Sequence, residues 1–132
     1  MIVTGAFLAE AAATVDNKLN VQGGVLSRYT VGPDRAARFV LVVLTQAEAE
    51  ASDGDRRLDV EIMPPKLDEV PQYRRFEVPE VAIGMFPGFA FFAIEVTLPF
   101  DGRWVIVVTC GSGAISLPLL VDGWVPPPSL GI

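Results

Sequence analysis

Apolar and polar side chains alternate with a period of two in several segments of this chain. The clearest is the segment 57–63, in which Leu58, Val60 and Ile62 alternate with charged residues. Successive side chains of a β-strand point to opposite faces of the sheet. This alternation therefore predicts a strand with one buried face and one wet face.

Two longer alternating segments, 89–98 and 103–110, are separated by a short polar link that contains Asp101 and Gly102. An Asp-Gly pair between two β-rich segments is typical of a type I′ turn, because both central residues of that turn need a positive φ. The pattern predicts a β-hairpin at this position.

The segment 39–45 reads FVLVVLT and is apolar at almost every position. Its β-branched residues favour a strand, and its two apolar faces favour burial. Two arrangements fit: a central strand covered on both faces, or a strand whose outer face meets another subunit.

Shorter strands are predicted over 2–8, 18–22, 25–31, 74–78 and 115–121. The Ala-rich link before Asp16 and Asn17 is predicted to hold a short helical turn, because alanine has the highest helix propensity, and the Asp-Asn pair then turns the chain. Pro118 cannot donate to a ladder, so the last strand is predicted to lie at an edge or to carry a bulge.

Eight or nine short strands with frequent Gly and Pro turn signals predict an all-β fold. A two-layer antiparallel β-sandwich is favoured, because segments such as 115–121 imply open edges, and a closed β-barrel is the alternative. Residues 1–123 are predicted to form one domain, followed by a Pro-rich C-terminal tail over 124–132.

Composition narrows the function classes. The chain has 132 residues, a net charge of −6 and 51% hydrophobic residues. This charge repels phosphate backbones and no basic stripe is present, so nucleic acid is not an expected partner. No apolar run reaches the roughly 18 residues of a membrane helix, and the N-terminus lacks the basic region of a signal peptide. We therefore expect no membrane insertion and a cytoplasmic location.

The sequence contains no histidine and only one cysteine, Cys110. A disulfide within the chain and every nucleophile that depends on histidine are excluded. Cys110 precedes a Gly-rich turn, but a buried, inert thiol is the simpler interpretation. Asp53 and Asp55 are weak candidates for a calcium site. The alternative interpretation is that they lie in the solvent-exposed tip of a turn. No cofactor is expected, and we expect a protein that is not an enzyme.

Phenylalanines are concentrated between residues 86 and 92. If Phe92 points into the core, Phe89 and Phe91 point outward, where an apolar surface usually marks an interface. Together with Leu41 and Val43 they are the predicted contact residues. The alternative is that the loop 64–71 or the C-terminal tail covers them within the chain.

The N-terminal pattern AFLAEAA over 6–12, DNKL over 16–19 and the glycine pair 23–24 resembles the opening of a family of short bacterial proteins that form a domain of unknown function. The resemblance covers about the first third of the chain. It implies a β-sandwich of immunoglobulin-like or C2-like topology, and it implies no activity, cofactor or catalytic residue.

Two functional hypotheses follow from the sequence. The first is a structural or interaction module that self-associates, with a two-fold dimer as the simplest closed form. The second is a small-molecule or calcium-binding domain, with its ligand held by Asp53 and Asp55 or in a pocket lined by Trp104, Trp124 and the phenylalanines.

Overall fold

The computed structural model describes residues 1–48, 55–111 and 113–125. These residues form ten β-strands and one 3₁₀ turn. In chain order they are β1 (Ile2–Ala9), β2 (Ala11–Val15), β3 (Lys18–Gln22), β4 (Arg28–Val31), β5 (Ala36–Gln46), β6 (Arg57–Met63), β7 (Gln72–Glu77), η1 (Glu80–Ala82), β8 (Gly88–Thr97), β9 (Gly102–Cys110) and β10 (Gly113–Gly123).

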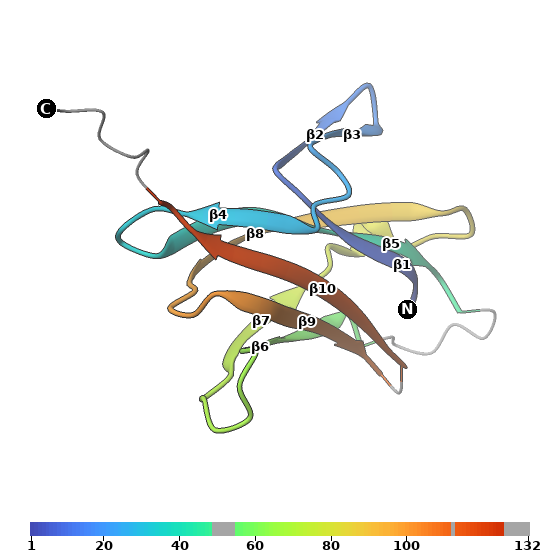
Figure 1. Ribbon diagram of the computed structural model, residues 1–132. Helices are drawn as coiled ribbons and strands as arrows, with labels where there is room; N and C mark the ends of the chain where they lie inside the picture. The colour runs from blue at the N-terminus through green and yellow to red at the C-terminus, as the bar shows by residue number, and fades with distance from the viewer. Residues whose placement is uncertain (49–54, 112, 126–132) are drawn as a thin grey trace, which may run out of the picture.

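The strands form two facing sheets and a separate hairpin (Figure 1). One sheet has the order β1-β5-β8 and the other the order β4-β10-β9-β6-β7, while β2 pairs only with β3. Every pair is antiparallel except β4 with β10. The predicted all-β sandwich is confirmed, with ten strands in the described residues instead of eight or nine.

In the described residues the two sheets hold three and five strands, compared with four and three in a constant-type immunoglobulin domain. Apart from the hairpin, the chain forms β1 in the three-stranded sheet, crosses to the five-stranded sheet for β4 and returns for β5. It then forms β6 and β7 in the five-stranded sheet, β8 in the three-stranded sheet, and β9 and β10 in the five-stranded sheet. Crossing between layers in this way is a Greek-key path. It places strands that are distant in sequence beside one another, such as β6 beside β9.

The core lies between the two sheets and follows the predicted alternation. Leu58, Val60 and Ile62 of β6 are completely or almost completely buried, and so are Ile94 of β8 and Ile106 of β9. Each of these side chains is an inward residue of a period-two strand. Burial of this apolar surface is the main source of stability in a chain with no disulfide.

The predicted hairpin at Asp101 and Gly102 is wrong. β8 pairs with β5, and β9 pairs with β6 and β10, so the link crosses from one sheet to the other. Gly102 has a φ of 126°, but Asp101 does not share the positive φ that a type I′ turn needs. Pro99 also lacks the N–H that would extend a ladder into this link. The apolar faces of β8 and β9 therefore meet across the core instead of side by side.

The tight two-residue turn occurs instead at Asp16 and Asn17. Their φ angles are 51° and 60°, and they join β2 to β3 with Val15 opposite Lys18. The turn itself was predicted, but the helical turn predicted before it is a strand. Pairing along the whole of β3 overrides the helix propensity of alanine.

The hairpin β2–β3 is inserted where the chain changes sheet. β1 leaves β5 at the pair Ala9 and Val40, and the chain returns as β4 in the other sheet. Beyond the pair Ala9 and Val40, β1 no longer lies along this edge of β5. There the Arg38 N–H donates a hydrogen bond of 3.1 Å to the Tyr29 hydroxyl. The Leu26 N–H donates to the Leu8 carbonyl at 2.7 Å. These bonds fix both ends of the insertion to the sandwich.

Side chains bridge the two sheets at the opposite edge, between β7 and β8. Arg74 donates to the Glu95 carbonyl at 2.9 Å, and Gln72 donates to the Thr97 carbonyl at 2.8 Å. Beside them the rings of Phe76 and Phe92 stack. No backbone ladder joins these two strands in the part of the chain described, so the structure is a sandwich with bridged edges and not a closed barrel.

Pro118 lies where β10 has a neighbour on one side only. β10 pairs with β9 along most of its length but with β4 only from Leu120 onward. The Leu120 N–H donates toward Ser27, and N–H groups two residues apart in a strand point the same way. The proline nitrogen therefore faces the side of β10 that β4 does not reach. The prediction of an edge strand or a bulge is wrong, because β10 lies between β4 and β9 and keeps an unbroken register with β9.

Trp104 fixes the connection between β8 and β9. Its side chain is 1% exposed, and its indole N–H donates to the Phe100 carbonyl at 2.9 Å. The indole fills the core and satisfies the carbonyl of the connecting loop.

We expect Trp104→Phe to lower the free energy of unfolding by about 2–3 kcal/mol, because it leaves a cavity and a carbonyl without its donor. Urea unfolding followed by circular dichroism measures the change. Trp124→Phe is the matched control, since Trp124 is 54% exposed, and it should change stability by less than about 0.5 kcal/mol. Equal effects of the two substitutions would contradict this account of Trp104.

Arg35, in the connection between β4 and β5, contacts the β8–β9 connection and the end of β10 at one end of the sandwich. Its Nε donates to the Leu98 carbonyl at 2.9 Å, and its Nη2 lies 2.9 Å from Oδ1 of Asp101, an ion pair without hydrogen-bond alignment. A Cβ at Gly123 would lie 2.6 Å from Nη1 of Arg35. A Cβ at this position would require the end of the Arg35 side chain to shift.

Gly123→Ala should therefore destabilise the fold modestly, by roughly 1 kcal/mol, because the guanidinium of Arg35 must shift away from its partners to admit the Cβ. The control is Gly84→Ala, because an added Cβ at Gly84 meets no atom within 4 Å. In an Arg35→Ala background the cost of Gly123→Ala should shrink, since the two positions are in contact. A thermal unfolding series on the four variants tests this, and an unchanged cost in that background would refute the proposed contact.

Candidate interaction site

The outer face of the three-stranded sheet is apolar over about half of its length. Strand register places Phe7, Val42 and Phe91 in one row across β1, β5 and β8. The next row holds Leu44 and Phe89. Successive residues of a strand alternate between faces, so these side chains point away from the core.

The same face becomes polar toward the other end of β5 and β8. There Arg38 and Glu95 lie opposite each other and form an ion pair of 3.6 Å. Both side chains are largely exposed, so the pair adds little to stability. It marks the boundary of the apolar half.

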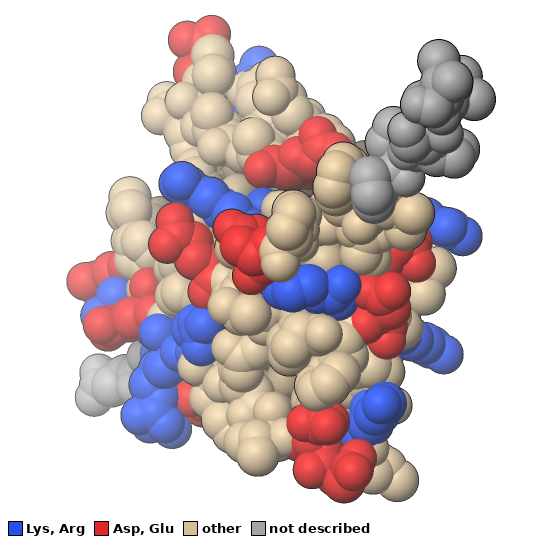
Figure 2. Space-filling model, turned by 60° about the vertical axis from the view of Figure 1, so that its left-hand side comes forward, with Lys and Arg blue, Asp and Glu red and all other residues tan. Residues whose placement is uncertain are grey.

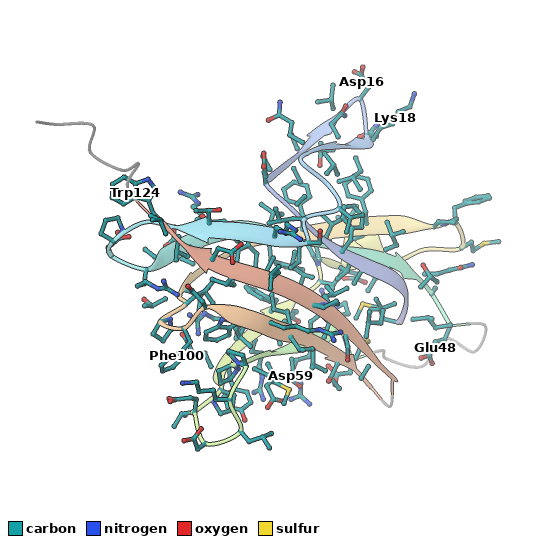
Figure 3. The ribbon with its side chains drawn as sticks, in the orientation of Figure 1. Asp16, Lys18, Glu48, Asp59, Phe100 and Trp124 are labelled. Atoms are coloured by element: carbon teal, nitrogen blue, oxygen red, sulfur yellow. The ribbon has the colours of Figure 1, made fainter. Side chains whose placement is uncertain are left out.

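The hairpin β2–β3 rises from this outer face, on the side of the molecule away from the five-stranded sheet (Figure 1). Figure 3 shows Asp16 and Lys18 at its tip, pointing into solvent. The segment that follows β3 covers Phe7: a Cβ at Gly24 would lie 3.2 Å from the Phe7 ring. Val42 is completely buried although it belongs to the outer face. The hairpin region therefore covers one part of this face and leaves another part open.

The open part is a groove of about 580 Å³. Phe89 and Phe91 of β8 line it, together with Thr14 and Asn17 from the hairpin. The remaining lining residues come from β8 and from the connection between β7 and β8: Pro79, Val81, Ala82, Pro87, Gly88, Ala90 and Phe92. None of the described residues that line the groove carries a charge.

The wall of the groove is held by two sets of hydrogen bonds. Thr45, which is buried in β5, donates from Oγ1 to the Ala82 carbonyl at 2.7 Å and fixes η1 against the sheet. The guanidinium of Arg56 donates to the Val78 carbonyl at 2.9 Å, and the Val78 N–H donates to the Arg56 carbonyl at 2.8 Å. These hydrogen bonds hold the wall of the groove in a defined position.

Large apolar side chains surround the groove and are exposed to solvent. Val81, Met85 and Phe86 are 94%, 85% and 81% exposed, and Val15 at the hairpin tip is about half exposed. Exposed apolar residues scattered singly need no explanation, but a cluster around a groove indicates a binding surface.

The structure separates the four predicted contact residues into two pairs. Phe89 and Phe91 face outward and are half-buried at the groove. Leu41 and Val43 are completely buried in the core, so their prediction as contact residues is wrong. Both faces of β5 are apolar, and the sequence alone does not show which of the two faces the core.

The loop 64–71, one of two segments suggested as a cover for the phenylalanines, lies elsewhere. The Lys66 ammonium sits 5.4 Å from the centre of the Phe100 ring, and Leu67 is fully exposed. The other suggested cover, the tail over 124–132, lies outside the described residues except for Trp124 and Val125. The loop 64–71 therefore does not cover the phenylalanines of β8. The hairpin β2–β3 region covers part of this face instead.

Sequence reasoning missed the roles of Thr14, Asn17, Val81 and Phe86. A signal for two of them was present: Val81 and Phe86 belong to an apolar run in a turn-rich segment, where polar residues are usual. For Thr14 and Asn17 no signal existed, because the segment that holds them was predicted to contain a helical turn.

Of the two acidic calcium candidates, the described residues include only Asp55, and it contacts Arg57. Oδ1 of Asp55 accepts a 3.0 Å hydrogen bond from the Arg57 N–H, and Oδ2 pairs with the Arg57 guanidinium at 3.7 Å. Asp53 lies outside the described residues. No group of three potential metal ligands is present in the part of the chain that the structure describes.

The two tryptophans do not line a common pocket. Trp104 is a core residue, and Trp124 lies beyond β10, where it is about half exposed (Figure 3). The predicted pocket formed by Trp104, Trp124 and the phenylalanines is therefore wrong. Only the phenylalanines of that set lie at the groove.

Cys110 is half-buried at the end of β9, with its sulfur 3.9 Å from the Met1 carbonyl oxygen. Burial raises the pKa of its thiol, with smaller contributions from the α-amino group, which lowers it, and from Asp55 and Glu48, which raise it. A raised pKa keeps the thiol protonated at neutral pH and makes it a poor nucleophile.

Because only the thiolate reacts, the alkylation rate of Cys110 with iodoacetamide should rise with pH through a midpoint that is higher in the folded protein than in urea. Mass spectrometry of timed samples from about pH 7 to 11 gives both profiles. A folded-state midpoint at or below that of the unfolded chain would be inconsistent with the burial of this thiol.

Comparisons with family models, with curated proteins and with solved structures gave no match for this chain. The resemblance of the N-terminal segment to a bacterial domain of unknown function therefore stays a prediction. Among the described residues, no helix has the length and apolar character needed to cross a bilayer.

Proposed function

We propose that this protein is a non-enzymatic interaction module that self-associates through the groove beside β8. The observation that carries the proposal is a groove with no charged lining residue, surrounded by exposed apolar side chains, in a chain of net charge −6. Interface cores are depleted in charge and enriched in aromatic residues and methionine. The groove and its surroundings have this composition.

The remainder of the surface has a different character. On the face shown in Figure 2, basic and acidic side chains lie next to one another. Asp59 also pairs with Arg75 at 2.8 Å and with Arg57 at 3.5 Å, and none of these three residues lines the groove. Mixed charge of this kind keeps a protein in solution. The contrast between this mixed-charge surface and the uncharged groove supports the groove side as the surface for association.

A second candidate is a site for an apolar small molecule. The volume of the groove falls within the range of ligand pockets, roughly 300–1,000 Å³. Such pockets usually also contain a few converging polar groups that orient the ligand. Among the described residues that line this groove, Thr14 and Asn17 alone have polar side chains, so self-association is the better supported function.

Phe89→Asp and Phe91→Asp should each reduce the oligomer to monomer at micromolar concentration. A buried carboxylate in an apolar contact costs at least about 2 kcal/mol, which weakens association roughly thirtyfold. Light scattering after size exclusion measures the mass, and native mass spectrometry reports any retained small molecule.

Tyr73→Asp is the control, because Tyr73 is an exposed aromatic residue on the edge strand β7. It should leave the mass unchanged. If both phenylalanine variants fold and keep the mass of an oligomeric parent, association through the groove is wrong. If the parent is a monomer that retains extra mass, self-association is wrong and the small-molecule site takes its place.

A further inference from the structure

Met85 and Phe86 form a projection beside the groove. They are among the most exposed apolar side chains in the described residues, and Pro87, the next residue, lines the groove. A projection and a cavity therefore lie next to each other on one face of the molecule. Neither contains a charged residue.

The projection is anchored through its backbone. The Ala47 N–H donates to the Gly84 carbonyl at 3.0 Å, and the Gln46 amide donates to the Met85 carbonyl at 3.5 Å. Gly88 on the other side is tightly placed, since a Cβ there would clash with the Ala82 carbonyl. The two apolar side chains are thus presented from a loop that is fixed at both ends, which lowers the entropic cost of binding.

The groove has room for both side chains of the projection. A cavity of about 150 Å³ accommodates a benzene-sized group, and the groove measures about 580 Å³. Its aromatic floor, Phe89 and Phe91, suits a phenyl ring and a thioether, because both pack well on aromatic rings.

From these observations we infer that the occupant of the groove is a second copy of this chain, with Met85 and Phe86 of each copy inserted into the groove of the other. This inference rests on the proposed function and specifies how the two copies contact each other. Two copies that each carry a charge of −6 repel one another, so they approach closely only through a face without charge. A two-fold axis between projection and groove makes both insertions at once and closes the assembly as a dimer.

The first test is Phe86→Ala, which should weaken the dimer at least tenfold, while Phe86→Leu keeps most of its affinity. Sedimentation across a concentration series measures the dissociation constants. Val125→Ala is the control, because Val125 is equally exposed but lies beyond β10, and it should leave dissociation unchanged.

The second test uses single cysteines in a Cys110→Ser background. Phe86→Cys and Thr14→Cys proteins are mixed and oxidised, and covalent dimers are quantified by mass spectrometry. Reciprocal insertion brings position 86 of one copy to position 14 of the other, so the mixed dimer should exceed both homodimers. Homodimers of the Phe86→Cys protein in excess over the mixed dimer would overturn the insertion.

The outcomes separate the two proposals. If Phe91→Asp dissociates the dimer but Phe86→Ala behaves as Val125→Ala does, self-association stands and the insertion fails. If neither variant dissociates the dimer, the groove is not the contact surface and both proposals fail. A parent protein that is monomeric at all concentrations also rejects both.

Discussion

Strand β5 is the constraint on which the other features depend. It is paired on both sides, and both of its faces are apolar. Phe39 and Leu41 on one face fill the core against the five-stranded sheet, whereas Val42 and Leu44 on the other face need a second cover. A two-layer sandwich does not supply that cover. The hairpin β2–β3 provides it for Val42, and the uncovered remainder becomes the groove beside β8.

The sequence predicts which residues form strands and which side of each strand is buried, because side-chain alternation depends only on local geometry. It does not predict which strands pair. Asp101 and Gly102 have the residue types of a hairpin turn, yet they join two sheets, whereas Asp16 and Asn17 form the tight turn of a hairpin. Pairing is decided by packing between distant segments, and the local composition of a turn contains little of that information.

The candidate site shows the same limit. The outward orientation of Phe89 and Phe91 follows from the inward orientation of Phe92, so alternation alone predicts it. Leu41 and Val43 were assigned to the outer face although they lie in the core. Both faces of their strand are apolar, so alternation does not indicate which face is buried. The hairpin wall of the groove was beyond prediction, because Thr14 and Asn17 reach it through a fold-level insertion and not through a local pattern.

Because this hairpin is inserted between β1 and β4, selection for the shape of the groove acts on different residues from selection for the stability of the sandwich. Its ends are fixed by the bond between Leu26 and Leu8 and by the close contact of Gly24 with Phe7, whereas its strands pair with each other alone. Residues at its tip therefore contribute to the shape of the groove without contributing to either sheet. Drift in the length or composition of the hairpin would change what the groove accepts while the sandwich that carries it stays the same, so recognition can diverge faster than the fold.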